Sequence, residues 1–301
     1  MTALPSTSVV VPVLNGAATI GDLLSALRGQ ARAPANTEII VVDNGSTDAT
    51  VDIVKEFGVT LMHETIRGPA AARNHGLHHA SGEVIAHLDA DTLPARTWLA
   101  ELVEPFADPH VHLAAGKTLS FRPETPAERY FARAQLYDAE TNVHRPVLPF
   151  AASLNMAVRR TSALAIHGWA EDMITAEDVE FSHRLLEAFP SEIVYQPSAV
   201  LFHRNRRTDA ELCRQAWTYG EGVAHLYQRY PDRLTWGVPQ TLHVVRSVVQ
   251  RWIIARTLRL GRSVRLASLE EHEFAHYHWL WTWWFWRGFQ SMYRHGERRV
   301  S

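Results

Sequence analysis

The chain has 301 residues, a formal net charge of -2, a single cysteine and 46% hydrophobic residues. Such a composition is typical of a globular chain with one large or two small domains, and it excludes a disordered tail, a collagen-like fibre and a disulfide-stapled scaffold. The charge is unevenly divided, because residues 1–232 hold 19 Lys and Arg against 28 Asp and Glu, whereas residues 233–301 hold 11 against 4. Seven of the ten tryptophans also lie in residues 233–301. We therefore expect two domains, an acidic body over residues 1–232 and a basic helical extension over residues 233–301.

The N-terminal segment has no feature of a cleaved secretion signal, since it lacks a positively charged flank and a long apolar core. The longest apolar stretch, residues 279–286, is far shorter than the roughly 20 residues that a membrane-spanning helix needs. Cys213 has no second cysteine with which to form an intrachain disulfide, which suits a reducing cytoplasm. The sequence thus predicts a cytoplasmic protein without a spanning helix.

Apolar runs of strand length alternate with helical patterns through the first third of the chain. Strands are predicted over residues 8–13, 38–42, 60–63 and 84–88, and helices over residues 18–30, 47–57 and 68–80. Because the strands show no polar alternation and helices separate them, they favour a parallel sheet covered on both faces. Ligands of such sheets bind beyond the carboxyl ends of the strands, which here carry Asn15-Gly16 and residues 43–46 and 89–91.

The pattern is less regular beyond residue 106. Several prolines surround a helical stretch over residues 127–141, which is either an insertion that completes the domain or a lid over the strand ends. We then expect a strand over residues 151–159, a helix over 177–189, two strands over 192–195 and 199–203, and a long helix over 209–230.

Two carboxylates directly follow the strand over residues 84–88. If desolvated, Asp89 and Asp91 repel each other, and a divalent cation removes that penalty. Carboxylate oxygens suit Mg²⁺ or Mn²⁺, which take few protein ligands and complete their shell with substrate phosphates. The plainer alternative is a solvated turn in which Asp91 and Thr92 cap a helix that begins near Pro94.

A second acidic cluster opens the helix over residues 177–189. A carboxylate of Glu177 or Asp178 can accept a proton from an attacking hydroxyl, as a general base does. Acidic residues in a first helical turn are also favoured by the helix dipole, so a helix cap on Thr175 or Asp178 is the alternative.

His203 ends the strand over residues 199–203, directly before Arg204, Arg206 and Arg207. Arginines bind phosphate oxygens through paired hydrogen bonds, so this stretch is a candidate ligand site. A histidine of the core or surface beside a solvated loop is the alternative.

Three well-known motifs are absent from the sequence. No Gly-x-Gly-x-x-Gly follows the first strand, and neither a phosphate-binding Gly-x-x-x-x-Gly-Lys-Ser/Thr loop nor a Gly-x-Ser-x-Gly elbow occurs. Dinucleotide oxidoreductases, P-loop ATPases and α/β-hydrolases therefore lose their main support.

Taken in chain order, the motifs resemble the family 2 glycosyltransferases, inverting enzymes with the GT-A fold. The matching stretches span roughly residues 8–205 and are Val9–Asn15, Glu38–Asp48, Ala72–Gly76 with Ala80–Glu83, Asp89–Asp91 and Glu177–Asp178. The resemblance implies an α/β fold with a mostly parallel sheet flanked by helices. It also implies a nucleotide-sugar donor and Mn²⁺ or Mg²⁺ as the cofactor.

The resemblance further implies a role for each site residue. Asp91 and His203 match metal ligands, and Asp89 would meet the ribose or a metal-bound water. Asp178 matches the general base, and Glu177 would orient the acceptor or the base. The donor-binding residues would be Pro12, Asn15, Asp43, Asn44, Arg73, Asp89 and Asn155.

One position departs from the family pattern, since many members have Asp where Asn44 stands. An amide offers both donors and acceptors, so it suits uracil, guanine and thymine alike. The donor is thus expected to be a UDP- or GDP-sugar. Specificity for the sugar is expected to lie in residues 110–170, where relatives diverge most.

The extension combines arginine with apolar surface. Residues 240–269 contain six arginines and no Asp or Glu, and a second helix, rich in tryptophan, is expected over residues 274–294. Its apolar sides need a cover, which is the body, an oligomer interface or an anionic membrane surface, where Trp and Arg are favoured. No nucleic-acid partner is expected, because the extension lacks a known binding module and the carboxylates of the body repel phosphates.

The sequence therefore predicts a metal-dependent inverting glycosyltransferase that acts on a hydroxyl of a glycan, a lipid-linked molecule or another glycoconjugate, peripherally at the cytoplasmic membrane face. One alternative is transfer to a polyprenyl phosphate, whose ionised oxygen needs no base. Another is a non-catalytic module that binds nucleotide sugars. A nucleotidyltransferase of related fold is disfavoured, because its glycine-rich N-terminal loop is missing.

Overall fold

The computed structural model describes residues 4–263 and 265–300, which form two compact units. The first, here the α/β unit, takes the chain up to Phe121 and returns over Tyr137–Arg204. The second, here the helical unit, takes Arg122–Leu136 and the chain from Asn205 onward. The domain boundary expected at residue 232 stays a prediction.

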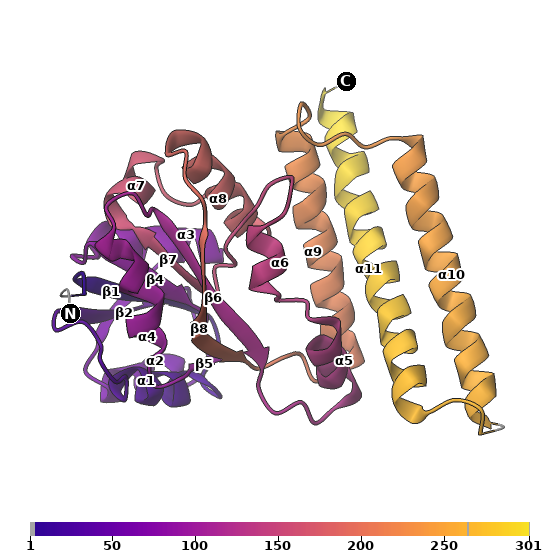
Figure 1. The fold of residues 1–301 in the computed structure, drawn as a ribbon, viewed down its shortest axis with the longest axis horizontal. Coiled ribbons are helices and arrows are strands. Elements are labelled where there is room, and N and C mark those ends of the chain that lie inside the picture. The colour runs from indigo at the N-terminus through magenta and orange to yellow at the C-terminus, as the bar shows by residue number, and fades with distance from the viewer. Residues whose placement is uncertain (1–3, 264, 301) are drawn as a thin grey trace. The chain divides into compact units, whose positions relative to one another are not determined.

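The α/β unit alternates strands and helices, as Figure 1 shows. Its strands are β1 (Thr7–Val13), β2 (Thr37–Asp43), β3 (Thr60–His63), β4 (Val84–Leu88), β5 (Thr92–Pro94), β6 (Leu113–Ser120), β7 (Asn155–Arg159) and β8 (Val194–His203). Its helices are α1 (Ile20–Arg28), α2 (Thr50–Glu56), α3 (Pro69–His79), α4 (Trp98–Val103), a short 3-10 helix (Glu104–Ala107), α6 (Ala139–Val143), α7 (Arg160–Ala165) and α8 (Glu177–Ala188).

The strands form one sheet in the order β3-β2-β1-β4-β7-β6-β8-β5. Strand β1 runs parallel to β2 and β4, β2 runs parallel to β3, and β6 runs parallel to β8. The remaining pairs, β4 with β7, β6 with β7 and β5 with β8, are antiparallel. The predicted α/β fold is confirmed, and the sheet is mixed, with its longest run of parallel strands, β3-β2-β1-β4, in the N-terminal half of the unit.

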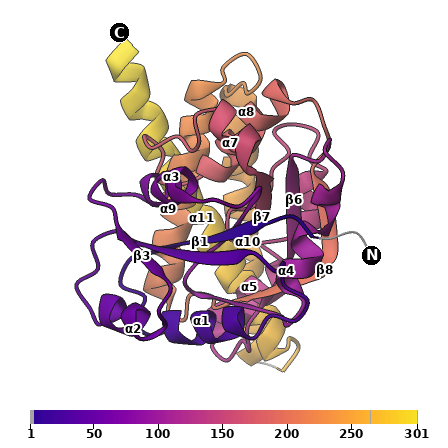
Figure 2. The same cartoon turned by 90° about the vertical axis from the view of Figure 1, so that its left-hand side faces the viewer.

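Both faces of the sheet are covered by helices. Alternate strand residues point to opposite faces, so Val9 and Val11 pack in one core with α1 and α4, whereas Val10 packs in another with α3 and α8. Figure 2 shows α1 and α2 on one side of the sheet and α3, α7 and α8 on the other. Burial on both faces explains why the strands β1, β2 and β4 read as uninterrupted apolar runs.

Four stretches differ from the sequence-based expectation. The two strands expected over residues 192–195 and 199–203 form the single strand β8, which pairs with β6 along both parts with a register shift between them. No helix begins near Pro94, because a hydrogen bond from Thr92 N to Asp89 O (3.2 Å) turns the chain into β5, and α4 starts only at Trp98. The helix expected over residues 127–141 is broken at Gln135, which has a φ of 48°. The strand expected from residue 151 begins at residue 155, because the N–H groups of Ala151 and Ser153 donate to side chains of α8.

The helical unit consists of α5 (Pro126–Ala134), α9 (Asp209–Arg229), α10 (Val238–Ser263) and α11 (Leu269–Val300). Helix α11 lies between α9 and α10 (Figure 1) and also packs on α5, where its Trp281 meets Phe131 edge-on at 5.5 Å. The helical extension expected from the sequence is confirmed, and its tryptophan-rich helix begins five residues before the expected start at residue 274. Among the described residues, no helix combines the length and the apolar composition needed to cross a bilayer.

Helices α9 and α11 touch through two glycines. A Cβ added to Gly220 would lie 2.0 Å from the carbonyl oxygen of Phe285, and one added to Gly288 would lie 2.0 Å from that of Trp217. The two helix backbones are therefore in direct contact, and neither position has room for a methyl group.

We expect Gly220→Ala to destabilise the helical unit by about 1–3 kcal/mol, because the methyl group forces the two backbones apart. Gly261→Ala in α10 is the matched control, since its Cβ would meet Ala267 at an ordinary 3.4 Å. There the better helix propensity of alanine makes the change neutral or stabilising by up to about 1 kcal/mol. Urea unfolding followed by tryptophan emission measures both variants, and equal midpoints for Gly220→Ala and wild type would contradict the close contact.

Candidate functional site

The loops after β1 and β2 are tied together at the carboxyl edge of the sheet. Asn15 Oδ1 accepts a hydrogen bond from Thr47 N (2.8 Å), and Asn15 N donates to Ser46 Oγ (2.8 Å). The buried carboxylate of Asp43 accepts hydrogen bonds from the backbone of its own loop, including Ser46 N at 3.2 Å. Pro12 is partly exposed in β1 beside this loop pair. Four of the predicted donor-binding residues thus lie close together, at the ends of β1 and β2 and in the loops that follow them: Pro12, Asn15, Asp43 and Asn44.

Asn44 is buried, and its amide is bound to the backbone of the loop before α3. Its Nδ2 donates to the carbonyl oxygens of Glu64 (3.1 Å) and Ile66 (2.7 Å), and its Oδ1 accepts from Gly68 N (2.8 Å). An aspartate could not donate to those two carbonyl groups. The geometry therefore favours a role for Asn44 in shaping the loop over a role in reading the donor base.

Arg73 lies at the centre of the site, on α3, and is almost completely buried. Its Nη1 donates to Glu177 Oε1 and its Nη2 donates to Asp89 Oδ1, both at 2.8 Å. One guanidinium thus joins the carboxylate that follows β4 to the carboxylate that opens α8, although the two are far apart in sequence. Charge-assisted bonds of this kind are strong and fix geometry.

Two aromatic residues behind Arg73 were missed from the sequence. The guanidinium of Arg73 lies over the buried ring of Trp169, 5.1 Å from its centroid. His87 of β4 meets Trp169 edge-on at 5.2 Å, and burial together with the charge of Arg73 holds its pKa well below the ordinary value, so the ring is neutral. Asn74, which follows Arg73, fixes Trp169 by accepting from its backbone N at Oδ1 (2.7 Å) and donating from Nδ2 to its carbonyl oxygen (3.0 Å), a contact across 95 residues that the sequence does not signal.

Asp91 and His203 are brought together by the short strand β5. Thr92 pairs with His203 in the antiparallel ladder of β5 and β8, which leaves His203 Nε2 3.6 Å from Asp91 Oδ1. Both residues are held further, since Arg204 N donates to Asp91 O (3.0 Å) and the Tyr137 ring lies 4.6 Å from the buried imidazole. The basic residues after His203 are engaged in ion pairs, Arg204 with Asp22 and Arg207 with Glu124.

Glu177 and Asp178 stand at the start of α8, after a residue in an unusual conformation. Ala176 has a φ of 61°, which is rare for a residue with a side chain, and no side chain caps the helix, so neither Thr175 nor Asp178 is the N-cap. Asp178 is instead the second helical residue, and its carboxylate accepts from Val179 N (2.9 Å) and Ser153 N (3.3 Å).

Three carboxylates surround the one guanidinium of Arg73. Burial raises the pKa of Glu177 to about 7; Arg73 opposes that rise and the nearby Asp178 adds to it. Burial also raises the pKa of Asp178 above its ordinary value. Because burial disfavours the charged form of Glu177 and Asp178 and Arg73 offsets only part of that effect, the pair retains a proton more readily than exposed carboxylates do.

Asn155 is a predicted site residue that lies buried in the sheet, at the start of β7. Its Oδ1 accepts from Trp98 Nε1 (2.8 Å), and its Nδ2 donates to Lys117 O (3.1 Å), which joins β7, α4 and β6. The side chain is almost fully buried among these partners. This placement favours a structural role for Asn155 over the expected contact with the sugar.

The arrangement suits a divalent cation shared with a ligand. Within the described residues, no group of three or more His, Cys, Asp and Glu side chains is arranged to hold a metal ion. Asp91 and His203 supply an oxygen and a nitrogen donor on the same side of the site, and Mg²⁺ or Mn²⁺ accepts one or two protein ligands when phosphate oxygens fill the rest of the shell. The residues present therefore fit a cation that arrives with a diphosphate.

Comparisons with known proteins give a consistent picture. The sequence profile described as Glycosyl transferase family 2 matches residues 8–165. The chain is 32% identical over 274 residues to the pre-mycofactocin glycosyltransferase of Mycobacterium tuberculosis. The match covers 87% of this chain and 54% of that protein. It is 30% identical over 232 residues to the glycosyltransferase AglE of Haloferax volcanii, which covers 74% of this chain and 75% of that protein. The chain thus spans about half the length of the mycobacterial relative.

Solved structures are similar at the level of the fold. The mannosyltransferase PcManGT from Pyrobaculum calidifontis, in complex with GDP-Man and Mn²⁺, superposes with a TM-score of 0.65 at 23% identity, over 93% of this chain and 86% of that chain. The glucosyl-3-phosphoglycerate synthase of M. tuberculosis, in complex with Mn²⁺, UDP and glucosyl-3-phosphoglycerate, gives 0.55 at 22% identity, over 75% and 80%. The GT-A fold implied by the sequence motifs is confirmed by these likenesses.

Proposed function

The chain belongs to glycosyl transferase family 2, and we propose that it transfers a sugar from a nucleotide-diphosphate sugar to an acceptor hydroxyl, with inversion at the anomeric carbon. The observation that carries this proposal is the bridge through Arg73, which holds Asp89 and Glu177 at 2.8 Å each. On this proposal Asp89 and Asp91 belong to the donor side and Glu177 and Asp178 to the acceptor side, and the bridge supports it by joining Asp89 to Glu177. A displacement reaction needs both sides held in line.

On the donor side, Asp91 and His203 would hold the cation, and the loops after β1 and β2 would hold the nucleoside. A cation bound there supplies positive charge to the diphosphate as it leaves the anomeric carbon. Asp89 is fixed by Arg73 yet one third exposed, so one of its oxygens is free to meet the ribose or a metal-bound water. UDP and GDP both suit this description.

On the acceptor side, Asp178 would take the proton from the acceptor hydroxyl as its oxygen attacks the anomeric carbon. The bond to the diphosphate oxygen breaks on the opposite face, so the configuration inverts. The pKa of Asp178 is raised toward neutral pH, which makes its carboxylate a more effective base because a general base works best when its pKa is close to the working pH. Glu177, bound to Arg73, would hold the start of α8 in place.

The acceptor we propose is a hydroxyl of a glycan or of a lipid-linked molecule, reached through peripheral association with an anionic membrane. The chemical support is the extension, which is rich in arginine and tryptophan. Both groups favour the interface of a bilayer.

Thermal unfolding with nucleotides tests the donor side. We expect Mn²⁺ alone to stabilise the protein little, since two side chains are few ligands, and Mn²⁺ with UDP or GDP to stabilise it strongly. Asp91→Ala should weaken the apparent metal affinity by at least about tenfold, and Glu56→Ala, an exposed acid at the end of α2, is the control. If Mn²⁺ with UDP and Mn²⁺ with GDP both leave the melting temperature unchanged, the donor site is wrong.

A further inference from the structure

The outer side of α10 is an apolar face that is exposed within the described part of the chain. Leu242, Val249 and Ile253 are 62%, 50% and 51% exposed. Val248 and Ala255, on the other side of the helix, are buried where α10 packs on α11. A monomeric surface rarely leaves such a continuous row of large apolar side chains in water, so the face indicates a binding surface.

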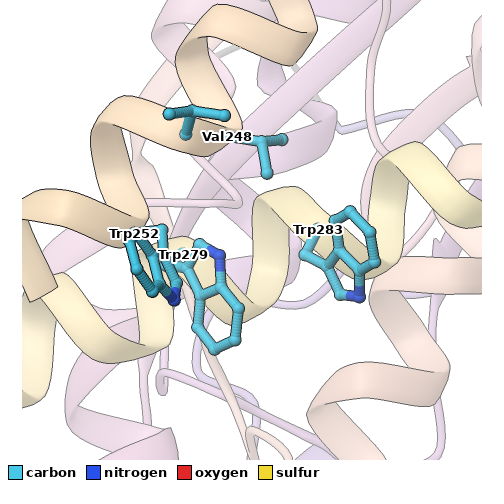
Figure 3. Close-up of a pocket in the computed structure, with 5 residues that line it drawn as sticks. Val248, Trp252, Trp279 and Trp283 are labelled. Atoms are coloured by element: carbon cyan, nitrogen blue, oxygen red, sulfur yellow. The ribbon is translucent and has the colours of Figure 1, made fainter. Parts of the chain in front are cut away.

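One hollow lies on this face and a second lies at its edge, where α10 packs on α11. A shallow groove on α10 is lined by apolar side chains together with Arg246 and Gln250. Where α10 meets α11, an almost wholly apolar pocket of about 200 Å³ is lined by Val248, Val249, Trp252, Trp279 and Trp283. Figure 3 shows Trp252 of α10 beside Trp279 of α11, with Trp283 one turn further along α11. The pocket offers indole rings and valines to an apolar group.

The same helix is strongly basic. It contains no Asp or Glu and five arginines, of which Arg251 packs inward and donates to Thr282. The four others are exposed and are Arg246, Arg256, Arg259 and Arg262. An occupant of this surface therefore needs to supply negative charge and apolar surface together.

A second copy of the chain does not meet that requirement. In a two-fold dimer both copies use the same surface patch, so a patch with exposed arginines and no Asp or Glu on α10 would meet another patch of the same sign. An anionic bilayer meets it, because headgroups can bind the arginines while acyl chains cover the leucines, valines and indoles.

We propose that the outer face of α10 binds an anionic lipid bilayer, lying in the plane of its interface. Arg246 and Arg256, which lie beside the apolar row at helical spacing, contact the headgroups, and Leu242, Val249 and Ile253 enter the boundary with the acyl chains. The membrane association put forward with the proposed function thereby gains a defined surface. That surface depends on α10 and not on the donor site. Experiments can therefore contradict the membrane surface without contradicting the proposed glycosyl transfer, and the reverse.

Flotation of the whole protein with vesicles tests the proposal. We expect binding to vesicles of equal parts phosphatidylglycerol and phosphatidylcholine at low salt, weaker binding at high salt, and little binding to phosphatidylcholine alone. Lipids brominated on their acyl chains should quench tryptophan emission, because Trp252 is 43% exposed on this face.

Two double variants separate charge from apolar contact. Arg246→Gln with Arg256→Gln should weaken the partition into anionic vesicles by about 25-fold, since each basic residue strengthens it by about fivefold. Leu242→Ser with Ile253→Ser should keep the salt dependence and lose the quenching by brominated lipid. The control, Arg32→Gln with Arg96→Gln, removes two exposed arginines from the α/β unit and should bind like wild type.

Three results would overturn the proposal: no binding to anionic vesicles at low salt, equal binding by both α10 variants and wild type, or self-association of the protein that the α10 variants abolish. Release of nucleoside diphosphate without vesicles is measured in parallel. Variants that lose vesicle binding and keep this release support the membrane surface. If wild type releases no nucleoside diphosphate, that result contradicts the proposed function and leaves the membrane surface untouched.

Discussion

The Asp178→Asn variant is expected to transfer sugar about 10²–10⁴-fold more slowly than wild type, because an amide cannot take the proton from the acceptor hydroxyl. The substitution keeps the size of the side chain, and the amide oxygen can still accept from Ser153 N, which lies 3.3 Å from Asp178 in wild type. Affinity for the donor should therefore be nearly unchanged. Turnover at saturating donor and acceptor, together with donor binding by calorimetry, measures the two effects separately.

Glu187→Gln is the matched control for that variant. It removes a half-exposed carboxylate from the same helix without touching Arg73, and it should leave turnover unchanged. Wild-type turnover in Asp178→Asn would contradict the assigned base. That outcome would favour an acceptor whose oxygen is already ionised, such as a polyprenyl phosphate.

Replacing Arg73 with Met is expected to cost about 3–5 kcal/mol of stability and to abolish most of the activity. The methionine fills much of the space but leaves Glu177, which is 6% exposed, without its positive partner. Without Arg73 the pKa of Glu177 rises further, so at neutral pH this carboxyl either takes up a proton or stays charged without a partner, and both outcomes destabilise the folded state. Urea unfolding at neutral pH measures the loss, and Arg96→Met, at an exposed position, is the control.

The pH dependence of stability gives a second view of this cluster. The pKa of Glu177 rises on folding from 4.5 to about 7, so the folded state binds a proton more tightly than the unfolded chain. This contribution to stability is full below about pH 4.5 and is lost as the pH rises through 7. The difference in unfolding free energy between wild type and Glu177→Gln should therefore shift against wild type over that range. A difference that is constant from pH 4.5 to 7 would contradict the raised pKa.

Much of the α/β unit could be predicted from sequence because its strands are buried on both faces. Buried parallel strands such as β1 and β4 read as plain apolar runs, and polar residues at their carboxyl ends stand out against them. Strand β6 could not be predicted in the same way. It contains Gly116, where an added Cβ would lie 2.5 Å from both Ala199 O and Asn155 Oδ1. The close approach of the neighbouring strands therefore requires glycine, a residue that in the sequence indicates the end of a strand.

The candidate site was predictable in its parts and not in its connections. Asp89, Asp91, Glu177 and Asp178 were visible as acidic residues next to strands and helices. The partners that join them come from distant parts of the chain: Arg73 bonds to Glu177, 104 residues later, and lies over Trp169. The hydrogen bonds of the Asn155 amide to buried partners in the sheet are likewise invisible in the local sequence. Spacing along the chain carries no information about such long-range pairs.

His203 has one further property. The chain passes between the α/β unit and the helical unit at three points, after Phe121, before Tyr137 and after Arg204. All three meet at this histidine: Phe121 N donates to its carbonyl oxygen at 2.9 Å, the Tyr137 ring packs on its imidazole, and Arg204 is the next residue. This candidate metal ligand therefore lies at the crossing points of the chain, and Phe121 and Tyr137 hold it there in addition to its own strand.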